Sequence, residues 1–157
     1  MQILFLCTAN SCRSILAEAV FNHLAPAHMR AHSAGSKPKG LIHPQSLLAL
    51  QRAGINTQGL HSKNHAAHQQ LNPDLVITLC DSAAAEPCPP FFGNAVKAHW
   101  GLPDPDGLGD TPAEVDAVFD RTIAAIQQRV TAFLELTKHS PDKQTFSREV
   151  QAIGERL

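Results

Sequence analysis

The sequence predicts a single α/β domain with a mainly parallel, four-stranded sheet flanked by helices. Residues 3–6 and 75–77 are short apolar runs without polar alternation, which is typical of strands buried on both faces. Longer segments between and after them carry apolar residues every three or four positions, the period of an amphipathic helix. Alternating strands and helices favour a parallel sheet, and 157 residues without a long linker predict one unit over residues 1–157.

The first half of the chain predicts a strand, a short loop and a helix in direct succession. The first strand ends at Cys7, and a helix is expected from Ser14 until Pro26 closes it. The apolar positions of this helix are Ile15, Leu16, Ala19, Val20 and Leu24. A second helix is expected over residues 44–53, and a third, weaker one after Ser62.

The second half predicts one further strand and the longest helix. Residues 81–94 are loop-like, with three prolines and a glycine, and residues 95–100 form a short strand. A capping sequence at Thr111 begins a helix that keeps one apolar stripe to about residue 137. Residues 140–157 are expected to form a short helical tail.

Composition disfavours several classes of partner. The chain has 13 Lys and Arg residues against 14 Asp and Glu residues, so its formal net charge of −1 gives no bulk attraction to nucleic acid or acidic membranes. No apolar run approaches the roughly 18 residues of a membrane span, and no basic segment precedes the first apolar run. We therefore expect a cytoplasmic protein, and we expect it to be a monomer.

Four cysteines in that compartment indicate catalysis, redox chemistry or metal binding more than structural disulfides. Four residues separate Cys7 from Cys12, and seven separate Cys80 from Cys88. Neither spacing is the short knuckle of a structural zinc site, so no metal is expected.

Residues 7–14, Cys-Thr-Ala-Asn-Ser-Cys-Arg-Ser, carry the strongest functional signal. A cysteine at the end of a buried strand, five intervening residues and an Arg-Ser that opens a helix direct backbone N–H groups at one small volume. Arg13 adds a planar fork of donors that matches a tetrahedral oxyanion, and in that field the Cys7 thiol is expected to ionise easily. The residues expected to bind the oxyanion are Thr8, Ala9, Asn10, Ser11, Cys12, Arg13 and Ser14.

With this loop the chain resembles the low-molecular-weight protein tyrosine phosphatase family, and within it the arsenate reductases built on that fold. The resemblance extends to about residue 136 and also rests on Ser33-Ala34-Gly35, Leu79-Cys80-Asp81, Cys88-Pro89 and the run from His99 to Pro105. It implies the low-molecular-weight phosphatase fold for the whole domain.

Two features favour the reductases over the phosphatases. The phosphatases usually have Gly and Pro where this chain has Ala9 and Ile15, and they follow the Asp-Pro motif with aromatic residues that hold a phenol ring. Here Asp106 follows the motif and the chain has no tyrosine. A reductase also needs further thiols to carry two electrons out of the pocket, and Cys80 and Cys88 are suited to that role.

The resemblance implies a mechanism and its partners. Arsenate, in competition with phosphate or sulfate, would bind the loop and be attacked by Cys7 while Asp104 acts as general acid. Cys80 would then form a disulfide with Cys7, and Cys88 would carry it outward to thioredoxin, with no bound cofactor. Cys88 lies eight positions after Cys80, whereas in the best-known thioredoxin-coupled members the corresponding offset is seven.

Other functions remain open on the sequence alone. The same reduction could be coupled to glutathione or mycothiol with a glutaredoxin, so the external thiol reductant is not fixed. The chain could instead be a phosphatase for small esters or a non-catalytic thiol sensor. The sensor hypothesis leaves Asp104 without a role.

A candidate cation-site region lies behind the loop. In some thioredoxin-coupled relatives a potassium ion lies near residues that match Asn10, Glu18 and Ser33, and an acidic ligand expected there aligns with Lys63. An ammonium group in that place would replace the ion and predicts no potassium dependence. The alternative is that Lys63 is a solvated surface residue.

The remaining residues near the motifs have supporting roles. Asn10 is expected to organise the loop backbone, and Ser14 to donate a hydrogen bond to the Cys7 thiolate. Cys12 is expected to be a small structural residue. His99 and Trp100 are expected to pack beside the segment that bears the acid.

Overall fold

The computed structural model describes residues 1–157 and contains one four-stranded sheet in which every neighbouring pair of strands is parallel. The spatial order is β2-β1-β3-β4. The strands are β1 (Gln2–Cys7), β2 (Arg30–Gly35), β3 (Leu75–Thr78) and β4 (Val96–His99). The predicted fold class is therefore confirmed, and the central pair β1 and β3 directs Cys7 and Cys80 to the same edge of the sheet.

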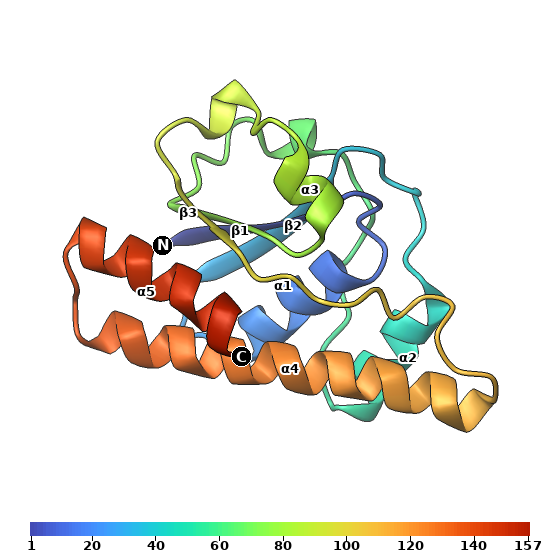
Figure 1. Cartoon of the computed structure of the whole chain (residues 1–157). Helices are drawn as coiled ribbons and strands as arrows, with labels where there is room; N and C mark the ends of the chain where they lie inside the picture. Colours follow the sequence, from blue (N-terminus) through green and yellow to red (C-terminus); the bar gives the residue numbers. More distant parts are fainter.

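Helices cover both faces of this sheet (Figure 1). They are α1 (Arg13–Leu24), α2 (Pro44–Arg52), α3 (Asp81–Ala85), α4 (Pro112–Lys138) and α5 (Lys143–Arg156), with short 3-10 helices η1 (His65–His68) and η2 (Pro90–Phe92). Thr111 and Glu114 form the expected capping box of α4, and the predicted tail helix is α5.

Alternate residues of the strands supply two hydrophobic layers. Ile3, Phe5, Leu75 and Ile77 belong to the larger layer with the buried sides of α1, α4 and α5. Leu4, Leu6 and Val76 face the other way and pack with Phe92 under the segment that contains α3. Because β1 and β3 are buried on both faces, they lack the polar alternation of a half-exposed sheet.

Three local expectations were incomplete. Residues 81–94 were expected to be a loop but contain α3 and η2, and the helix expected after Ser62 is only the single 3-10 turn η1. No specific segment was predicted for the fourth strand, which is β2. No helix of the structure is long and apolar enough to cross a membrane.

Candidate active site

The loop from Cys7 to Arg13 has its carbonyls directed outward and its amides left free. Thr8, Ala9 and Ser11 accept hydrogen bonds through their carbonyls from the backbone N–H groups of residues 37, 39 and 43, at 3.0, 3.0 and 3.1 Å. None of the amide N–H groups from residue 9 to residue 12 donates to a protein acceptor. A concave row of free amides that precedes a helix is an arrangement that binds anions.

Asn10 fixes the shape of this loop from inside. It has a positive φ of 47° and is fully buried. Its Nδ2 donates to Ser14 Oγ at 2.8 Å and to Ser33 Oγ at 3.0 Å, and its Oδ1 accepts from the Lys63 amide at 2.9 Å. Asn10 therefore organises the backbone as expected, whereas no hydrogen bond joins Ser14 to Cys7.

Gly35, at the end of β2, permits the close approach of the loop. A Cβ atom there would lie 2.3 Å from the Thr8 carbonyl oxygen and 2.8 Å from that of Cys7. Backbone atoms cannot yield to that contact as a flexible side chain can. The last residue of the Ser33-Ala34-Gly35 motif thus allows the loop to lie against β2 because it has no side chain.

Arg13 and Asp104 meet at the mouth of the loop. Arg13 Nη2 lies 3.6 Å from Asp104 Oδ2, and Nη1 donates to the Leu102 carbonyl at 3.0 Å. The Arg13 Nε atom is buried without a partner. The Asp104 side chain is 55% exposed, so its carboxyl can exchange protons with solvent. This leaves one buried guanidinium donor beside a titratable carboxyl, at the place where an oxyanion would lie.

Cys7 and Cys80 are buried neighbours beneath the loop, and each thiol shifts the pKa of the other. Cys80 lies at the N-cap of α3, where its Sγ accepts from the Ala83 amide at 3.4 Å, and Thr8 Oγ1 lies 3.6 Å away. These contacts, the hydrogen bond with Cys7 foremost, lower the pKa of Cys80 to about 5. A thiolate at a helix N-terminus is stabilised in this way.

The location of the thiolate differs from the sequence prediction. The hydrogen bond to Cys80 and burial both raise the pKa of Cys7, and the nearby Arg13 guanidinium only partly opposes them. The pKa of Cys7 is therefore raised and that of Cys80 lowered, so the thiolate of this coupled pair is favoured on Cys80. The sequence could not show this because it depends on the contact between the two sulfurs.

Cys88 is half-buried and lines a cavity of about 390 Å³ that also reaches Cys7. Ala83 and Ala84 of α3 border the same space, as do Thr78 and His99 from the ends of β3 and β4. All three thiols expected to act are thus at one edge of the sheet. Cys12 is a buried N-cap residue of α1, and burial raises the pKa of its thiol.

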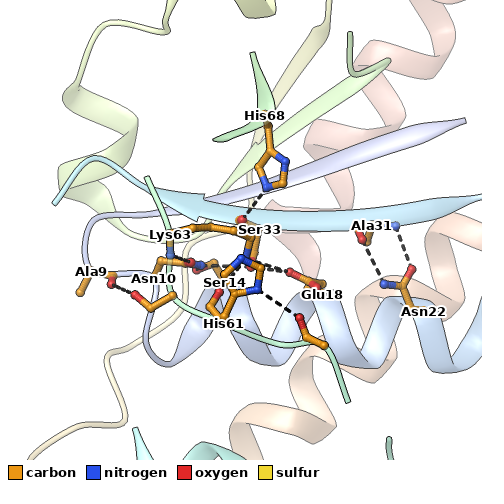
Figure 2. A network of polar contacts seen from close by, with 12 residues as sticks. Ala9, Asn10, Ser14, Glu18, Asn22, Ala31, Ser33, His61, Lys63 and His68 are labelled. Carbon is orange, nitrogen blue, oxygen red and sulfur yellow. Dashed lines mark hydrogen bonds and ion pairs between the residues drawn. The ribbon is translucent and has the colours of Figure 1, made fainter. Parts of the chain in front are cut away.

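The four residues of the candidate cation-site region are also brought together (Figure 2). Ser33 Oγ donates to Glu18 Oε1 at 2.6 Å, and Lys63 Nζ lies 3.7 Å from that oxygen and donates to the His61 carbonyl at 2.7 Å. The Lys63 and Glu18 side chains are only 10% and 11% exposed. Burial lowers the pKa of Lys63, which Glu18 opposes. Lys63 is therefore not a solvated surface lysine.

The group that holds the start of the Asp104 segment was not predicted from the sequence. Arg129 of α4 donates to the carbonyls of Trp100 and Gly101 at 2.6 and 3.1 Å. Its signal was present, because a charged residue three positions after Ile126 interrupts the apolar stripe of that helix. Trp100 is buried as expected, and its Nε1 donates to the Val150 carbonyl of α5 at 2.9 Å.

His99 does more than pack beside the acid segment. Its Nδ1 lies 2.8 Å from Thr78 Oγ1, and its Nε2 lies 3.1 Å from Asp81 Oδ1. The ring thereby connects the end of β4 to the first residue of α3. Gly101 gives it room, because a Cβ there would lie 2.9 Å from Nε2.

This fold and cradle define the class of protein. The family model of the low molecular weight phosphotyrosine protein phosphatases matches residues 2–151, and the chain belongs to that family. Among its members the chain is similar to arsenate reductases. Those of Halalkalibacterium halodurans and Bacillus subtilis are each 35% identical to it over 136 residues, which is 87% of this chain and 96% of each relative.

Solved structures show the same relationship. A thioredoxin-dependent arsenate reductase of Corynebacterium glutamicum is 27% identical, with a TM-score of 0.67 over 89% of this chain and 63% of that one. An arsenate reductase in its phosphate binding state is 27% identical, with a TM-score of 0.69 over 83% and 93%. A Vibrio cholerae low-molecular-weight phosphatase at 20% identity and a TM-score of 0.71, over 89% of this chain and 98% of that one, shares the fold.

Proposed function

We propose that this chain reduces arsenate to arsenite, with Cys7 as nucleophile and an external thiol as the source of electrons. The observation that carries the proposal is that the buried thiols of Cys7 and Cys80 are neighbours beneath a loop of free amides. A phosphatase needs one nucleophile under its oxyanion, whereas a reductase needs a second sulfur within reach of the first. The curated relatives at 35% identity are named arsenate reductases, which supports the same reading.

The first step forms a bond between sulfur and arsenic. Arsenate binds the amides of residues 8–14 and the free Nε–H of Arg13, so its charge is met by donors already in place. The proton of Cys7 passes along the hydrogen bond to the Cys80 thiolate, which frees Cys7 to attack arsenic. One arsenate hydroxyl leaves as water after it takes a proton from Asp104, and its bond to arsenic breaks.

The second step reduces arsenic. Cys80 attacks the Cys7 sulfur, the sulfur–arsenic bond breaks, and its electron pair stays on arsenic, which passes from As(V) to As(III). The proton of Cys80 goes to the departing arsenite. The products are arsenite and a Cys7–Cys80 disulfide, so the two thiols have supplied both electrons.

The third step moves the disulfide outward. Cys88 attacks Cys80, releases Cys7 as a thiolate and leaves a Cys80–Cys88 disulfide for the external reductant. Residues 80–88 must rearrange for this step. The small side chains of Ala83 and Ala84 border a cavity of about 390 Å³, which gives the rearranged segment room. Thioredoxin is the reductant we favour, because a third thiol is required only if an external protein cannot reach Cys7.

The Lys63 ammonium supports the loop in this scheme without a bound metal ion. It places a positive charge beside Glu18, which accepts from Ser33, which in turn accepts from Asn10. We infer that the enzyme does not depend on potassium.

The test is arsenate-dependent oxidation of NADPH by the full chain with thioredoxin and thioredoxin reductase, compared with glutathione and glutaredoxin. Turnover with thioredoxin supports the whole proposal, and turnover only with glutathione and glutaredoxin keeps the reduction but changes the partner. No arsenite with either system refutes the proposed function and favours a thiol sensor. Hydrolysis of an aryl phosphate in place of arsenate reduction would assign the cradle to a phosphatase.

A further inference from the structure

The polypeptide that carries Asp104 is held at its start by a second buried arginine. Arg129 of α4 is 5% exposed, and its Nη1 and Nη2 donate to the carbonyls of Trp100 and Gly101 at 2.6 and 3.1 Å. Its acceptors are backbone oxygens, and its Nε is buried without a partner. The guanidinium thus forms hydrogen bonds only with the first two residues of the segment.

A charged side chain at this position carries a cost that an apolar one would avoid. Burial lowers the pKa of Arg129, and no carboxylate forms an ion pair with it to offset the lost hydration. A hydrophobic residue of similar volume could pack between Ile126 and Phe133 without that cost. The guanidinium donates hydrogen bonds to the two carbonyls, which a hydrophobic residue could not do.

Arg129 and Arg13 together bind three successive carbonyls. Arg13 takes the next one, that of Leu102, at 3.0 Å, and the same side chain meets Asp104. The amides of Trp100 and Leu102 donate to Thr78 and Leu79 of the β3 end at 2.8 and 3.0 Å. Residues 100–102 are therefore fixed on both sides of the backbone, and Asp104 lies two residues beyond.

We propose that Arg129 is a positioning residue for Asp104, which it holds above the oxyanion loop through the backbone of Trp100 and Gly101. The inference rests on the proposed function, in which Asp104 is the general acid. Arg129 touches neither the sulfurs nor the place of the oxyanion. Its loss should therefore weaken protonation of the leaving oxygen and leave binding by the loop intact.

A double-mutant cycle tests this through the dependence on Asp104. Arg129→Met should lower single-turnover arsenite release about 10- to 100-fold, because small misplacements of a catalytic group cost about that much. In the Asp104→Asn background the same change should cost less than about three-fold, since no acid is left to misplace. A full additional loss in that background would overturn the inference and assign Arg129 to general stability.

Two controls separate positioning from misfolding. Phosphate should protect Cys7 from alkylation equally well in Arg129→Met and in the wild type, and loss of that protection overturns the inference. Arg129→Lys keeps the charge and one donor direction, so its rate of arsenite release should lie between those of Arg129→Met and the wild type. Arg121→Met changes an exposed arginine of the same helix and should leave the rate unchanged.

A second measurement keeps this inference separate from the proposed function. Amide hydrogen exchange at residues 100–106 should accelerate in Arg129→Met, while exchange in α1 stays as in the wild type. Unchanged exchange overturns the positioning role even if arsenate is reduced. If the wild type releases no arsenite but exchange at residues 100–106 still accelerates in Arg129→Met, the positioning role is retained and the proposed function is refuted instead.

Discussion

The oxyanion loop and the redox segment, residues 80–92, lie at the same edge of the sheet but are held very differently. In the loop, three carbonyls accept from backbone amides, and Asn10 has three hydrogen bonds, two of them buried. In the redox segment, α3 has five residues, none of them buried, and the contacts of Glu86 to Ser36 and of Asp81 to His99 are exposed. Cys80 at the start and Phe92 at the far end are buried, and Cys88 packs against the cluster that contains Phe92.

This difference matches the two tasks of the proposed reaction. Donors that stabilise a transition state are most effective when they are already in place, so the loop is braced on its outer side. A disulfide that must travel from Cys7 to Cys88 needs a segment that can change shape at little cost in free energy. Few buried apolar contacts and solvent-exposed hydrogen bonds are the features of such a segment.

The largest expected effects come from removing the thiols that join the two regions. Cys7→Ser should abolish the reaction, because Cys7 is the thiol placed to attack the oxyanion in the loop. Cys80→Ser should allow the arsenic adduct but lack an internal thiol to resolve it. Cys88→Ser should release about one arsenite per enzyme and stop as a Cys7–Cys80 disulfide, since the disulfide can no longer be passed outward to the external reductant.

A single-turnover arsenite assay with disulfide mapping by mass spectrometry distinguishes these stages. Cys12→Ser is the matched control, because Cys12 lies in the loop but outside the relay. Repeated turnover of Cys88→Ser with thioredoxin alone would mean that the redox segment need not move. The contrast between the two regions would then have no role in catalysis.

The next effect concerns the acid at the mouth of the loop. Asp104→Asn keeps the shape but removes the proton, so arsenate-dependent turnover should fall by about 10²- to 10⁴-fold. Hydrolysis of an aryl phosphate with a good leaving group should suffer less, because a phenolate of low pKa needs little protonation. Asp110→Asn, in the same segment, is the control. Unchanged turnover in Asp104→Asn would make Asp104 a turn residue, whose Oδ1 only accepts from the Asp106 amide.

The sequence predicted the oxyanion loop better than the strand that lies against it, for a physical reason. A strand buried on both faces, a cysteine and an Arg-Ser helix start are local patterns, and the loop between them is formed by neighbours in the chain. The strand β2 was not predicted because it contains polar residues. Ser33 donates a hydrogen bond to Glu18, and His32 Nε2 lies 2.8 Å from Gln2 Oε1. Those contacts join residues 15 and 30 positions apart.

The proton distribution between Cys7 and Cys80 could not be predicted from the sequence either. A helix start and an arginine predict an acidic Cys7, but contact with Cys80 and burial outweigh both. The same applies to Arg129, whose carbonyl partners lie 28 and 29 residues away. Local pattern could identify the candidate site residues, whereas their charge states and supports depend on tertiary contacts.

A smaller and more specific effect should appear in the titration of the thiols. The pKa of Cys80 is lowered to about 5, so its thiolate should persist from neutral pH downward and be lost as pH falls through about 5. Thiolate absorbance in the ultraviolet measures this directly. Cys7→Ser removes the largest cause of the shift and should move the titration of Cys80 upward, toward its ordinary value of 9.0.

Two further variants complete that titration. Cys80→Ser should remove the acidic transition, and Cys12→Ser should leave it in place, because burial raises the pKa of Cys12. An acidic transition that persists in Cys80→Ser would place the thiolate on Cys7. The loop alone would then activate its nucleophile without help from the redox segment.

The smallest effect is expected behind the loop, where Lys63 replaces a diffusible cation with a tethered one. Exchange of sodium for potassium at constant ionic strength should change wild-type turnover by less than about two-fold.

Lys63→Gln leaves the Glu18 carboxylate buried without its cation, so the free energy of unfolding should fall by up to about 3 kcal/mol. In that variant potassium should restore part of the lost stability, as a ligand that binds only the folded state does. Lys138→Gln, which removes an exposed lysine paired with Glu135, should show neither effect. Thermal unfolding in both salts measures the comparison, and potassium activation of the wild type would show that the ammonium of Lys63 does not take the place of the ion.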